Sequence, residues 1–418
     1  MLPSGFEKIE KDAAEQTPPP ALHTSTGHCP SRDEKVSTTI ETLSSLILPE
    51  SLGIQRDHIV TEAVRPPQFD NHYDFHTLFY DAFFVPESHT IRLICPRLLN
   101  LEDFIKEATF TSNGEKLTPR LQRPNWRNDE ISLRCSKAPT GLKVRFQETE
   151  LSVSPGTQDR ESFRGLRCAV LKSRNNDLAW ISDWASYHVK VHSLEGLVVF
   201  DNGSDQYTVE DVASVLLGVE GLKVVRVLSA DFPFGPNADG SDIHQAKFLQ
   251  GALVEIARLR YLQCAASVLL VDIDELVSPV PQSTIFDLAE KSFLGYVSIP
   301  GRWQYPEGAN MAPARHVDHV YVSPTDTPCR PKYCIVPQGR LGNCYWDLHS
   351  LGFGRSRLGM ICRNILRRAL KRMLTNDDAR FWHCRQITTH WKYKRENPAP
   401  EQLRLDTASK ELLDRVFE

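Results

Sequence analysis

The sequence predicts an α/β protein with a mainly parallel, Rossmann-like sheet flanked by helices and preceded by a small antiparallel β module. Three observations predict this fold. Apolar runs and amphipathic stretches alternate over residues 167–299, the pattern of successive β-α-β units. Short alternating runs separated by Pro and Gly fill residues 67–160, as in an antiparallel module. An apolar run, Val268–Val271, leads directly into Asp272 and Asp274, which is typical of a buried strand ending at a ligand-binding edge.

Length and composition set the domain organisation. The chain has 418 residues and is 41% hydrophobic, which allows two or three domains with ordinary cores. Residues 1–66 are poor in aromatics and rich in Pro, Ser, Thr and Glu, so we expect this segment to be mostly disordered. We expect the β-rich module at 67–160, the main domain at 161–400 and a tail or helix at 401–418.

Charge and hydropathy restrict the partners and the location. The formal net charge of -4 argues against a general nucleic-acid binder. No stretch has the roughly 18 to 20 apolar residues of a membrane-spanning helix, and the first thirty residues lack a signal-peptide apolar region. We therefore expect a cytoplasmic protein. A predicted basic helix at 357–374 could contact anionic lipid, or it could pack by its apolar stripe and leave its charges in solvent.

The main domain is predicted as strands and helices that alternate along the chain. No G-x-G-x-x-G follows its first strand and no P-loop motif occurs, which argues against a standard dinucleotide fold and a P-loop enzyme. The predicted strands cover 167–171, 197–200, 223–228, 268–271 and 295–299. The predicted helices cover 177–191, a stretch beginning at Thr208, 242–264 and a stretch beginning at Thr284.

Asp272 and Asp274 stand one residue apart at the end of a predicted strand. Two carboxylates at this spacing repel each other unless a divalent cation sits between them. Their hard oxygen atoms suit Mn²⁺ or Mg²⁺, usually together with the phosphates of a substrate. An isolated D-x-D can equally cap a turn and face water. The surrounding motifs must therefore distinguish a metal site from a solvent-exposed turn.

Three motifs in this order resemble the GT-A-type glycosyltransferases of families 2 and 92. They are the stretch at 171–204 that contains Asp183-Trp184, the helix HQAKFLQGAL at 244–253 and VLLVDIDELVSP at 268–279. A later T-H-W-K-Y-K at 389–394 resembles the family's H-Y-x-x-K-S stretch. The similarity covers about residues 167–397. Asp183-Trp184 replaces the usual Glu-Trp and Leu276 replaces Phe, departures that concern the substrate more than the fold.

The resemblance implies a GT-A-like domain that transfers a sugar from a nucleoside-diphosphate sugar to a hydroxyl of a glycan, a lipid-linked molecule or another acceptor. It implies that Asp274 binds Mn²⁺ or Mg²⁺ at the donor phosphates, and that Asp272 contacts the ribose or sugar and shares the metal. The implied donor-binding residues are Lys172, Asp201, Asn202, Gln245, Asp272 and His390.

A later histidine often completes the metal shell in this family, and the candidates are His349 and His390. His349 lies in a glycine-bearing segment that could close over a donor. His390 is followed by Lys392 and Lys394, which suit a diphosphate or an anionic acceptor better than a cation. We therefore predict Asp272, Asp274 and His349 as metal ligands and His390 as a donor or acceptor contact.

Inverting transfer also requires a carboxylate base that takes the proton of the acceptor hydroxyl. Asp347, Asp318 and Glu307 all lie in the acceptor half of the sequence, and no pattern chooses among them. We name Asp347 first because it neighbours His349. The predicted catalytic residues are therefore Asp347 and Asp274.

Three other functions fit parts of the pattern. A sugar-nucleotide nucleotidyltransferase also uses paired acids and Mg²⁺, but it usually has a Gly-rich basic loop after the first strand, and residues 174–177 are not Gly-rich. A non-catalytic carbohydrate-binding protein would not need the intact acids. A phosphatase of the haloacid-dehalogenase type would need other residues where Glu275 and Leu276 stand.

Overall fold

The structure is a computed structural model that describes residues 36–236, 243–306, 314–352, 376, 378–389 and 400–418. The description below concerns these residues of the range 36–418. The predicted basic helix at 357–374, His390 and Glu307 lie outside the described residues.

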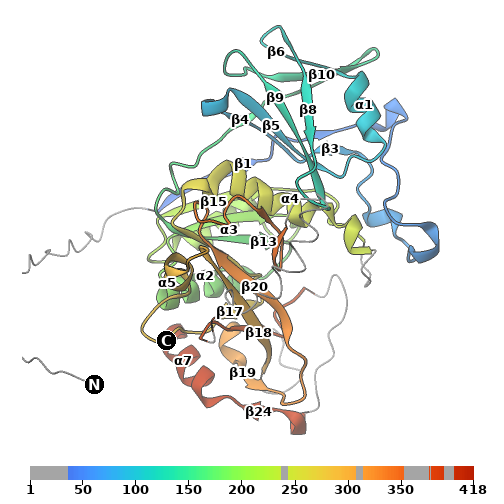
Figure 1. Ribbon diagram of the computed structural model, residues 1–418. Coiled ribbons are helices and arrows are strands. Elements are labelled where there is room, and N and C mark those ends of the chain that lie inside the picture. The colour runs from blue at the N-terminus through green and yellow to red at the C-terminus, as the bar shows by residue number, and fades with distance from the viewer. Residues whose placement is uncertain (1–35, 237–242, 307–313, 353–375, 377, 390–399) are drawn as a thin grey trace, which may run out of the picture. The chain divides into compact units, whose positions relative to one another are not determined.

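A large mixed sheet is the centre of the described chain (Figure 1). Within the described residues it has 11 strands, and its main path runs β1-β15-β14-β13-β16-β20-β18-β19-β24, with β17 and β23 paired beside β18. The strands are β1 (Ser37–Thr42), β13 (Arg167–Ser173), β14 (Gly196–Asp201), β15 (Val224–Ser229), β16 (Ser267–Leu270), β17 (Glu275–Val277), β18 (Tyr296–Pro306), β19 (His319–Val322), β20 (Cys329–Ile335), β23 (Phe381–Cys384) and β24 (Arg404–Leu405).

Only half of this sheet is parallel, so the predicted mainly parallel sheet is confirmed in part. Strands β1, β15, β14, β13 and β16 all run parallel to their neighbours. Strand β20 then pairs antiparallel with both β16 and β18. A parallel crossover needs a long connection, usually a helix. Among the described residues between β18 and β20 there is only a 3₁₀ turn at His316–Asp318 and strand β19, so antiparallel pairing follows.

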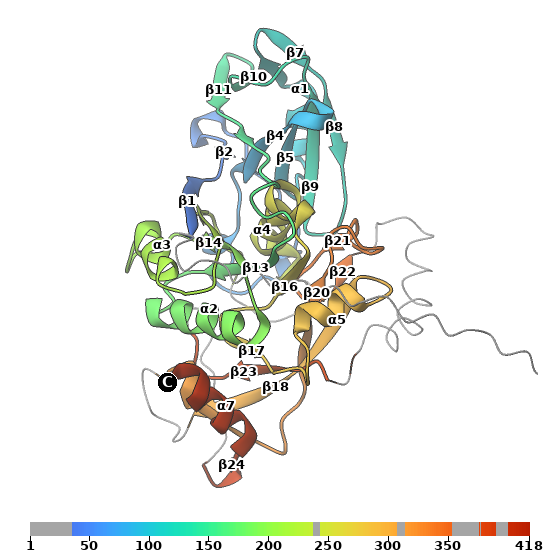
Figure 2. The same ribbon diagram turned by 90° about the vertical axis from the view of Figure 1, so that its left-hand side faces the viewer.

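Helices cover both faces of the sheet. One face packs against α2 (Leu178–His192), α3 (Val209–Leu217), α5 (Ile285–Lys291) and α7 (Thr407–Phe417) through a single apolar core. The other face packs against α4 (Phe248–Ile256), which lies between the sheet and the β-rich module (Figure 2). The predicted helix starts at Thr208 and Thr284 are confirmed, because each threonine forms a capping box with an aspartate three residues later.

The β-rich module is built from mainly antiparallel sheets around its own apolar core, with one parallel pair, β12 beside β4. The Asn113-Gly114 turn joins two of its strands with positive φ at both residues, as its sequence predicts. The aromatic cluster that includes Phe79, Tyr80 and Phe83 is buried. The module contains β2 (Leu46–Ile47), β3 (Thr77–Phe79), β4 (Asp81–Val85), β5 (Thr90–Pro96), α1 (Leu101–Glu107), β6 (Thr109–Ser112), β7 (Glu115–Leu117), β8 (Pro119–Gln122), β9 (Asn128–Arg134), β10 (Leu142–Phe146), β11 (Thr149–Val153) and β12 (Gly156–Thr157).

Residues 36–66 differ from the disorder that we expected there. Strand β1 forms an edge of the large sheet and pairs with β15 along six residues, from Ser37 opposite Val224 to Thr42 opposite Ser229. Its β-branched threonines and Ile40 favour extended structure, and the free edge of β15 supplies backbone partners. Average composition does not reveal such a short strand.

The predicted helix at 242–264 is also divided. It consists of a 3₁₀ turn (Ile243–Ala246), α4, a π turn (Ala257–Tyr261) and a second 3₁₀ turn (Leu262–Cys264). In the π turn the Arg260 guanidinium forms ion pairs with Asp81 of β4 and Glu41 of β1. These buried ion pairs join the module to both the helix and the sheet.

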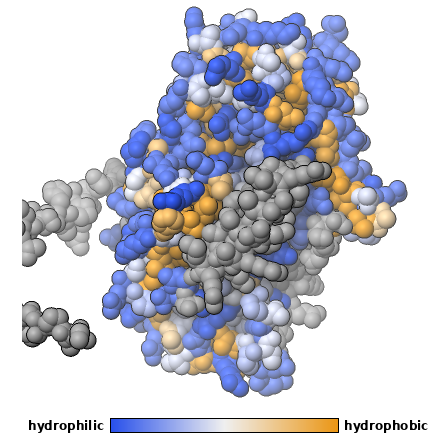
Figure 3. Space-filling view, in the orientation of Figure 1, coloured by the Kyte–Doolittle hydropathy of each residue, from blue (hydrophilic) through white to orange (hydrophobic). Residues whose placement is uncertain are grey.

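In the view of Figure 3, hydrophobic patches among the described residues are separated by hydrophilic residues. The exposed large hydrophobic residues, which include Ile47, Phe293 and Leu405, come from different elements. Among the described helices, none combines the length and the apolar composition needed to cross a bilayer.

Candidate functional site

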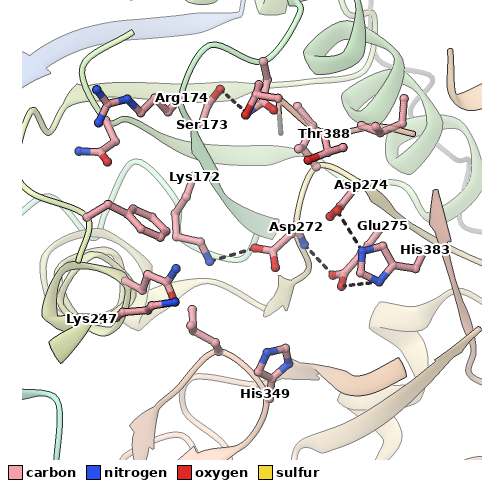
Figure 4. Close-up of a pocket in the computed structure, with 18 of the residues that line it drawn as sticks. Lys172, Ser173, Arg174, Lys247, Asp272, Asp274, Glu275, His349, His383 and Thr388 are labelled. Carbon is pink, nitrogen blue, oxygen red and sulfur yellow. Dashed lines mark hydrogen bonds and ion pairs between the residues drawn. The ribbon is translucent and has the colours of Figure 1, made fainter. Parts of the chain in front are cut away.

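A cavity of about 460 Å³ lies where the strands of the parallel half end (Figure 4). Lys172 and Ser173 at the end of β13, Asn202 after β14 and the turn Asp272–Glu275 after β16 form part of its wall. His383 of β23 and Trp303 of β18 close it from the other half of the sheet, together with Leu348-His349 from the hairpin of β21 (Tyr345–Trp346) and β22 (Leu351–Gly352). The acids of the D-x-D motif therefore face a cavity shared by both halves of the sheet.

Helix α2 holds the turn that carries these acids. The indole Nε1 of Trp184 donates to the carbonyl oxygens of Asp272 and Glu275, both at 3.0 Å. The Tyr187 hydroxyl donates to the Val277 carbonyl at 2.8 Å. Residues spaced three and four apart lie on one helix face. Trp184 and Tyr187 are three residues apart, so both can donate hydrogen bonds to the same segment, 272–277.

Three buried histidines behind the turn share one bonding pattern. His188 and His192 each have one ring nitrogen near a carbonyl oxygen and the other near a backbone N–H, and His319 does the same beside Gln386. A neutral imidazole satisfies this arrangement, with one donor and one acceptor. Burial lowers the pKa of His192 to about 4 and that of His319 to about 3. These histidines therefore act as neutral parts of the scaffold.

Asp272 is held by two lysines. Its Oδ1 lies 3.2 Å from Lys172 Nζ, and its Oδ2 forms an ion pair with Lys332 Nζ. Burial raises the pKa of Asp272, but the two ammonium groups outweigh burial and hold it well below its usual range. Asp272 is therefore ionised and largely neutralised by protein cations.

Lys332 also joins Asp272 to Glu275. Its Nζ lies 3.1 Å from Glu275 Oε2, and that same oxygen accepts a hydrogen bond from the Asp272 amide at 2.8 Å. The Lys332 side chain is 2% exposed. Burial lowers its pKa, but the two carboxylates dominate and raise it above the usual range. Burial also raises the pKa of Glu275 despite the nearby lysine.

Asp274 faces a different partner. Its Oδ2 lies 2.9 Å from Nε2 of His383, whose ring stacks on Trp303 with centroids 4.0 Å apart. Within the described residues, Asp274, Glu275 and His383 form a group whose candidate ligand atoms all lie within 4.8 Å of one another. The Nδ1 atom of His383 is buried without a hydrogen-bond partner. Two carboxylates with one imidazole fit Mn²⁺, and they fit Mg²⁺ less well because it prefers oxygen ligands.

The predicted ligand set Asp272, Asp274 and His349 is only partly brought together. His349 lines the cavity, and its Nδ1 lies 3.3 Å from the Pro331 carbonyl. Burial and the charge of Lys332 lower its pKa to about 3. However, the compact group contains His383 in place of His349, and the oxygens of Asp272 contact lysines.

Some of the predicted donor-binding residues line the cavity and others do not. Lys172 and Asn202 line the cavity, and the Asn202 amide nitrogen donates to Ala230 and Phe232 carbonyls while its Oδ1 has no partner within the described residues. Asp201 instead accepts hydrogen bonds from the amide and hydroxyl of Ser204, at 2.9 and 2.5 Å. Gln245 lies in the 3₁₀ turn before α4, outside the cavity wall.

The position of Asp347 does not support its assignment as the base. Its Oδ1 lies 3.0 Å from Arg127 Nε, and Asp347 is not part of the cavity wall. Of the other two candidates, Asp318 accepts a hydrogen bond from the Arg315 amide at 2.6 Å in a 3₁₀ turn.

Three residues of the site gave no recognisable signal in the sequence. They are Arg127, Lys332 and His383, which belong to the β-rich module, β20 and β23. The one hint that His383 offers is a histidine within an otherwise apolar strand, and Lys332 offers a weaker one because its strand also carries Arg330. Charged residues and histidines also occur at solvent-exposed positions of strands, so their presence in a strand does not identify a site.

Comparisons with known proteins give limited information. No protein-family model matches the chain, and no significant match is found among curated proteins. Among solved structures, the chain is similar to a mycobacterial protein with 14% identity and a TM-score of 0.26, over 60% of this chain and 74% of the other. It is also similar to the glucosyl-3-phosphoglycerate synthase of Mycobacterium tuberculosis, with 12% identity and a TM-score of 0.24, over 60% and 78% of the two chains.

A third similarity is to the bifunctional glycosyltransferase WbbM, with 12% identity and a TM-score of 0.23. It covers 39% of this chain and 26% of that chain. Similarities of this size carry no argument about the activity or substrate of the chain, and the proposal below rests on the site.

Proposed function

We propose that the protein is a metal-dependent glycosyltransferase that moves a sugar from a nucleoside-diphosphate sugar to a hydroxyl acceptor. One observation carries the proposal. A compact acid and histidine group, Asp274 with Glu275 and His383, adjoins cationic side chains in a single cavity at the ends of parallel strands. Open α/β sheets bind ligands at this edge, and a diphosphate needs both a cation site and basic side chains.

We assign the residues of the cavity to three parts of the donor, the metal-bound diphosphate, the sugar or ribose, and the nucleoside. Asp274, Glu275 and His383 would hold Mn²⁺, which supplies charge stabilisation to a departing diphosphate. Lys172 and Lys247 would contact the phosphate oxygens. Asp272 is ionised and oriented by its two lysines, so its oxygens can accept hydrogen bonds from ribose or sugar hydroxyls. Asn202 offers a buried amide oxygen to the nucleoside side.

Two further parts of the proposal concern the acceptor and the location. A neighbouring hollow of about 420 Å³ shares Thr389 with the cavity and has Asn175, Gln206 and Tyr207 in its wall, which suits the hydroxyls of a glycan or lipid-linked acceptor. We propose a cytoplasmic location with peripheral membrane contact through residues 357–374, and no nucleic-acid partner.

Donor turnover tests the proposal. The full chain is incubated with UDP-, GDP- and dTDP-sugars, and release of the nucleoside diphosphate is followed with Mn²⁺, with EDTA, and with Mn²⁺ restored after EDTA. We expect slow release of one diphosphate that EDTA abolishes and Mn²⁺ restores. Release of pyrophosphate from a nucleoside triphosphate and a sugar phosphate would identify a nucleotidyltransferase instead. Sugar binding without any turnover would identify a carbohydrate-binding protein.

A further inference from the structure

Arg127 is the residue by which the β-rich module reaches the cavity. It lies in the loop between β8 and β9, and it lines the cavity together with residues that are far away in the sequence. Its Nη1 donates to the carbonyl oxygens of His244 and Lys247, at 3.2 and 3.3 Å. Its Nε lies 3.0 Å from Asp347 Oδ1, an ion pair by distance that lacks the angles of a hydrogen bond.

These contacts join two parts of the cavity wall. His244 and Lys247 precede α4, and both line the cavity. Asp347 directly precedes Leu348 and His349, which also line it. A planar guanidinium presents its donors in a fixed fork and can hold two such groups at a set angle, whereas an ammonium group on a flexible stem sets no such angle. Without Arg127, neither segment would have this link to the other.

Arg127 itself is held firmly. Asn125 Oδ1 accepts hydrogen bonds from the amides of Arg127 and Asn128, at 2.5 and 2.9 Å. The guanidinium carbon lies 4.0 Å from the centre of the Trp126 ring, within the range of a cation–π contact. The loop is therefore organised before any substrate binds.

Helix α4 leaves room for this arginine at one residue. Gly251 lies within α4, where glycine is a poor helix former. A Cβ at this position would first meet the Tyr345 hydroxyl and would also come within 2.9 Å of Arg127 Cδ, so the space serves both residues. Glycine therefore permits the close approach of the arginine to the helix.

We propose that Arg127 is a positioning residue of the active site, which makes the β-rich module part of the catalytic unit. The structural part of this proposal stands by itself, and only the expected effect on KM for the donor rests on the proposed function. The arginine keeps the segments 244–247 and 347–349 at the spacing that a donor requires, so its loss would weaken donor binding more than it slows the chemical step.

Hydrogen exchange of the full chain tests the positioning without any substrate. In Arg127→Ala we expect exchange to rise about tenfold in both 244–253 and 345–349, while β5 and β9 keep their protection. Arg134→Ala is the matched control, because Arg134 is an exposed arginine at the end of β9. Unchanged exchange in the two segments of Arg127→Ala would overturn the proposal.

Kinetics of donor turnover separate positioning from a merely structural role. We expect Arg127→Ala to raise KM for the donor about tenfold with a smaller fall in kcat, and Arg127→Lys to lie between it and the wild type. Faster exchange with an unchanged KM would show that the residue is only structural, and would overturn the functional part. If the wild type turns over no donor, the proposed function fails, while the exchange data still decide the positioning.

Gly251→Ala gives an independent test. Helix propensity alone favours alanine, which predicts slower exchange in α4. Crowding of Tyr345 and Arg127 predicts the opposite, faster exchange in 345–349 and a raised KM. The effect should be smaller when Gly251→Ala is made in the Arg127→Ala variant, where only Tyr345 is crowded. Exchange and KM equal to the wild type would contradict the close approach on which the proposal depends.

Discussion

The parallel and the antiparallel halves of the large sheet supply different chemistry to one cavity. The parallel half ends in Lys172, Asn202 and the acidic turn, and α2 fixes that turn from one side. The antiparallel half supplies Lys332 and His383. As a result, two acids that are one residue apart have opposite surroundings. Asp272 is neutralised by lysines, whereas Asp274 is paired with a histidine in a group that can bind a metal.

This difference teaches that a D-x-D motif is not a symmetric pair of ligands. In this chain the strands opposite the motif decide which acid contacts a cation of the protein and which is available to a metal ion. Four predictions test the distinction, from the largest expected effect to the smallest.

The largest effect is expected at Asp274. Asp274→Asn should lower donor turnover about a thousandfold or more, roughly 4 kcal/mol of transition-state stabilisation, because an amide oxygen lacks the charge of the carboxylate. Thermal unfolding should change little. Asp205→Asn, an exposed acid outside the cavity wall, is the control and should be active. Turnover of Asp274→Asn within about threefold of wild type would exclude the metal role.

The second effect concerns the stability that Lys332 provides. Lys332→Met leaves buried Glu275 beside Asp272 without their shared cation, which should cost about 3 kcal/mol or more of the free energy of unfolding. Denaturant unfolding measures it. Lys223→Met removes the exposed pair with Glu195 and should cost less than about 1 kcal/mol. Equal losses in the two variants would contradict the buried bridging role.

The third prediction compares the two histidines of the cavity. His383→Ala should raise the Mn²⁺ concentration for half-maximal turnover by about 10- to 100-fold, since it removes a ligand from the compact group. His349→Ala should leave that concentration nearly unchanged. Titration of Mn²⁺ against both variants is the measurement. A shift confined to His349→Ala would restore the ligand set predicted from the sequence.

The smallest effect at neutral pH is that of the scaffold histidines, whose contribution to stability changes only as the pH falls. Because burial lowers the pKa of His192 to about 4, the unfolded chain binds a proton at His192 below about pH 6.5 that the folded chain does not. Stability is therefore lost as the pH falls from about 6.5 to 4, by up to about 1.4 kcal/mol per pH unit for this residue. His192→Gln should reduce the slope of unfolding free energy against pH by that amount. An unchanged slope would mean that His192 is charged in the folded protein.

Local patterns allowed many of the elements to be predicted from the sequence. The apolar runs at β13, β14, β15 and β16 and the capping boxes at Thr208 and Thr284 depend on residues that are neighbours in the chain. Asp274 was predicted for the same reason, since it follows an apolar run, whereas Lys172 and Asn202 were implied by the resemblance to glycosyltransferases. The single helix predicted at 242–264 failed at the π turn, where Arg260 pairs with residues of two other strands.

Local sequence patterns predict the types of most elements between residues 167 and 299 and the acidic turn that follows β16. Only the tertiary structure decided that β1 joins the sheet, that Lys332 bridges Asp272 and Glu275, that His383 faces Asp274, and that Arg127 reaches the cavity from another module. The physical reason is that periodicity reports whether a side chain is buried, which is a local property. Which groups then meet depends on strand order and register between segments that are distant in the chain, and a change of register by one residue turns Lys332 or His383 to the opposite face of the sheet.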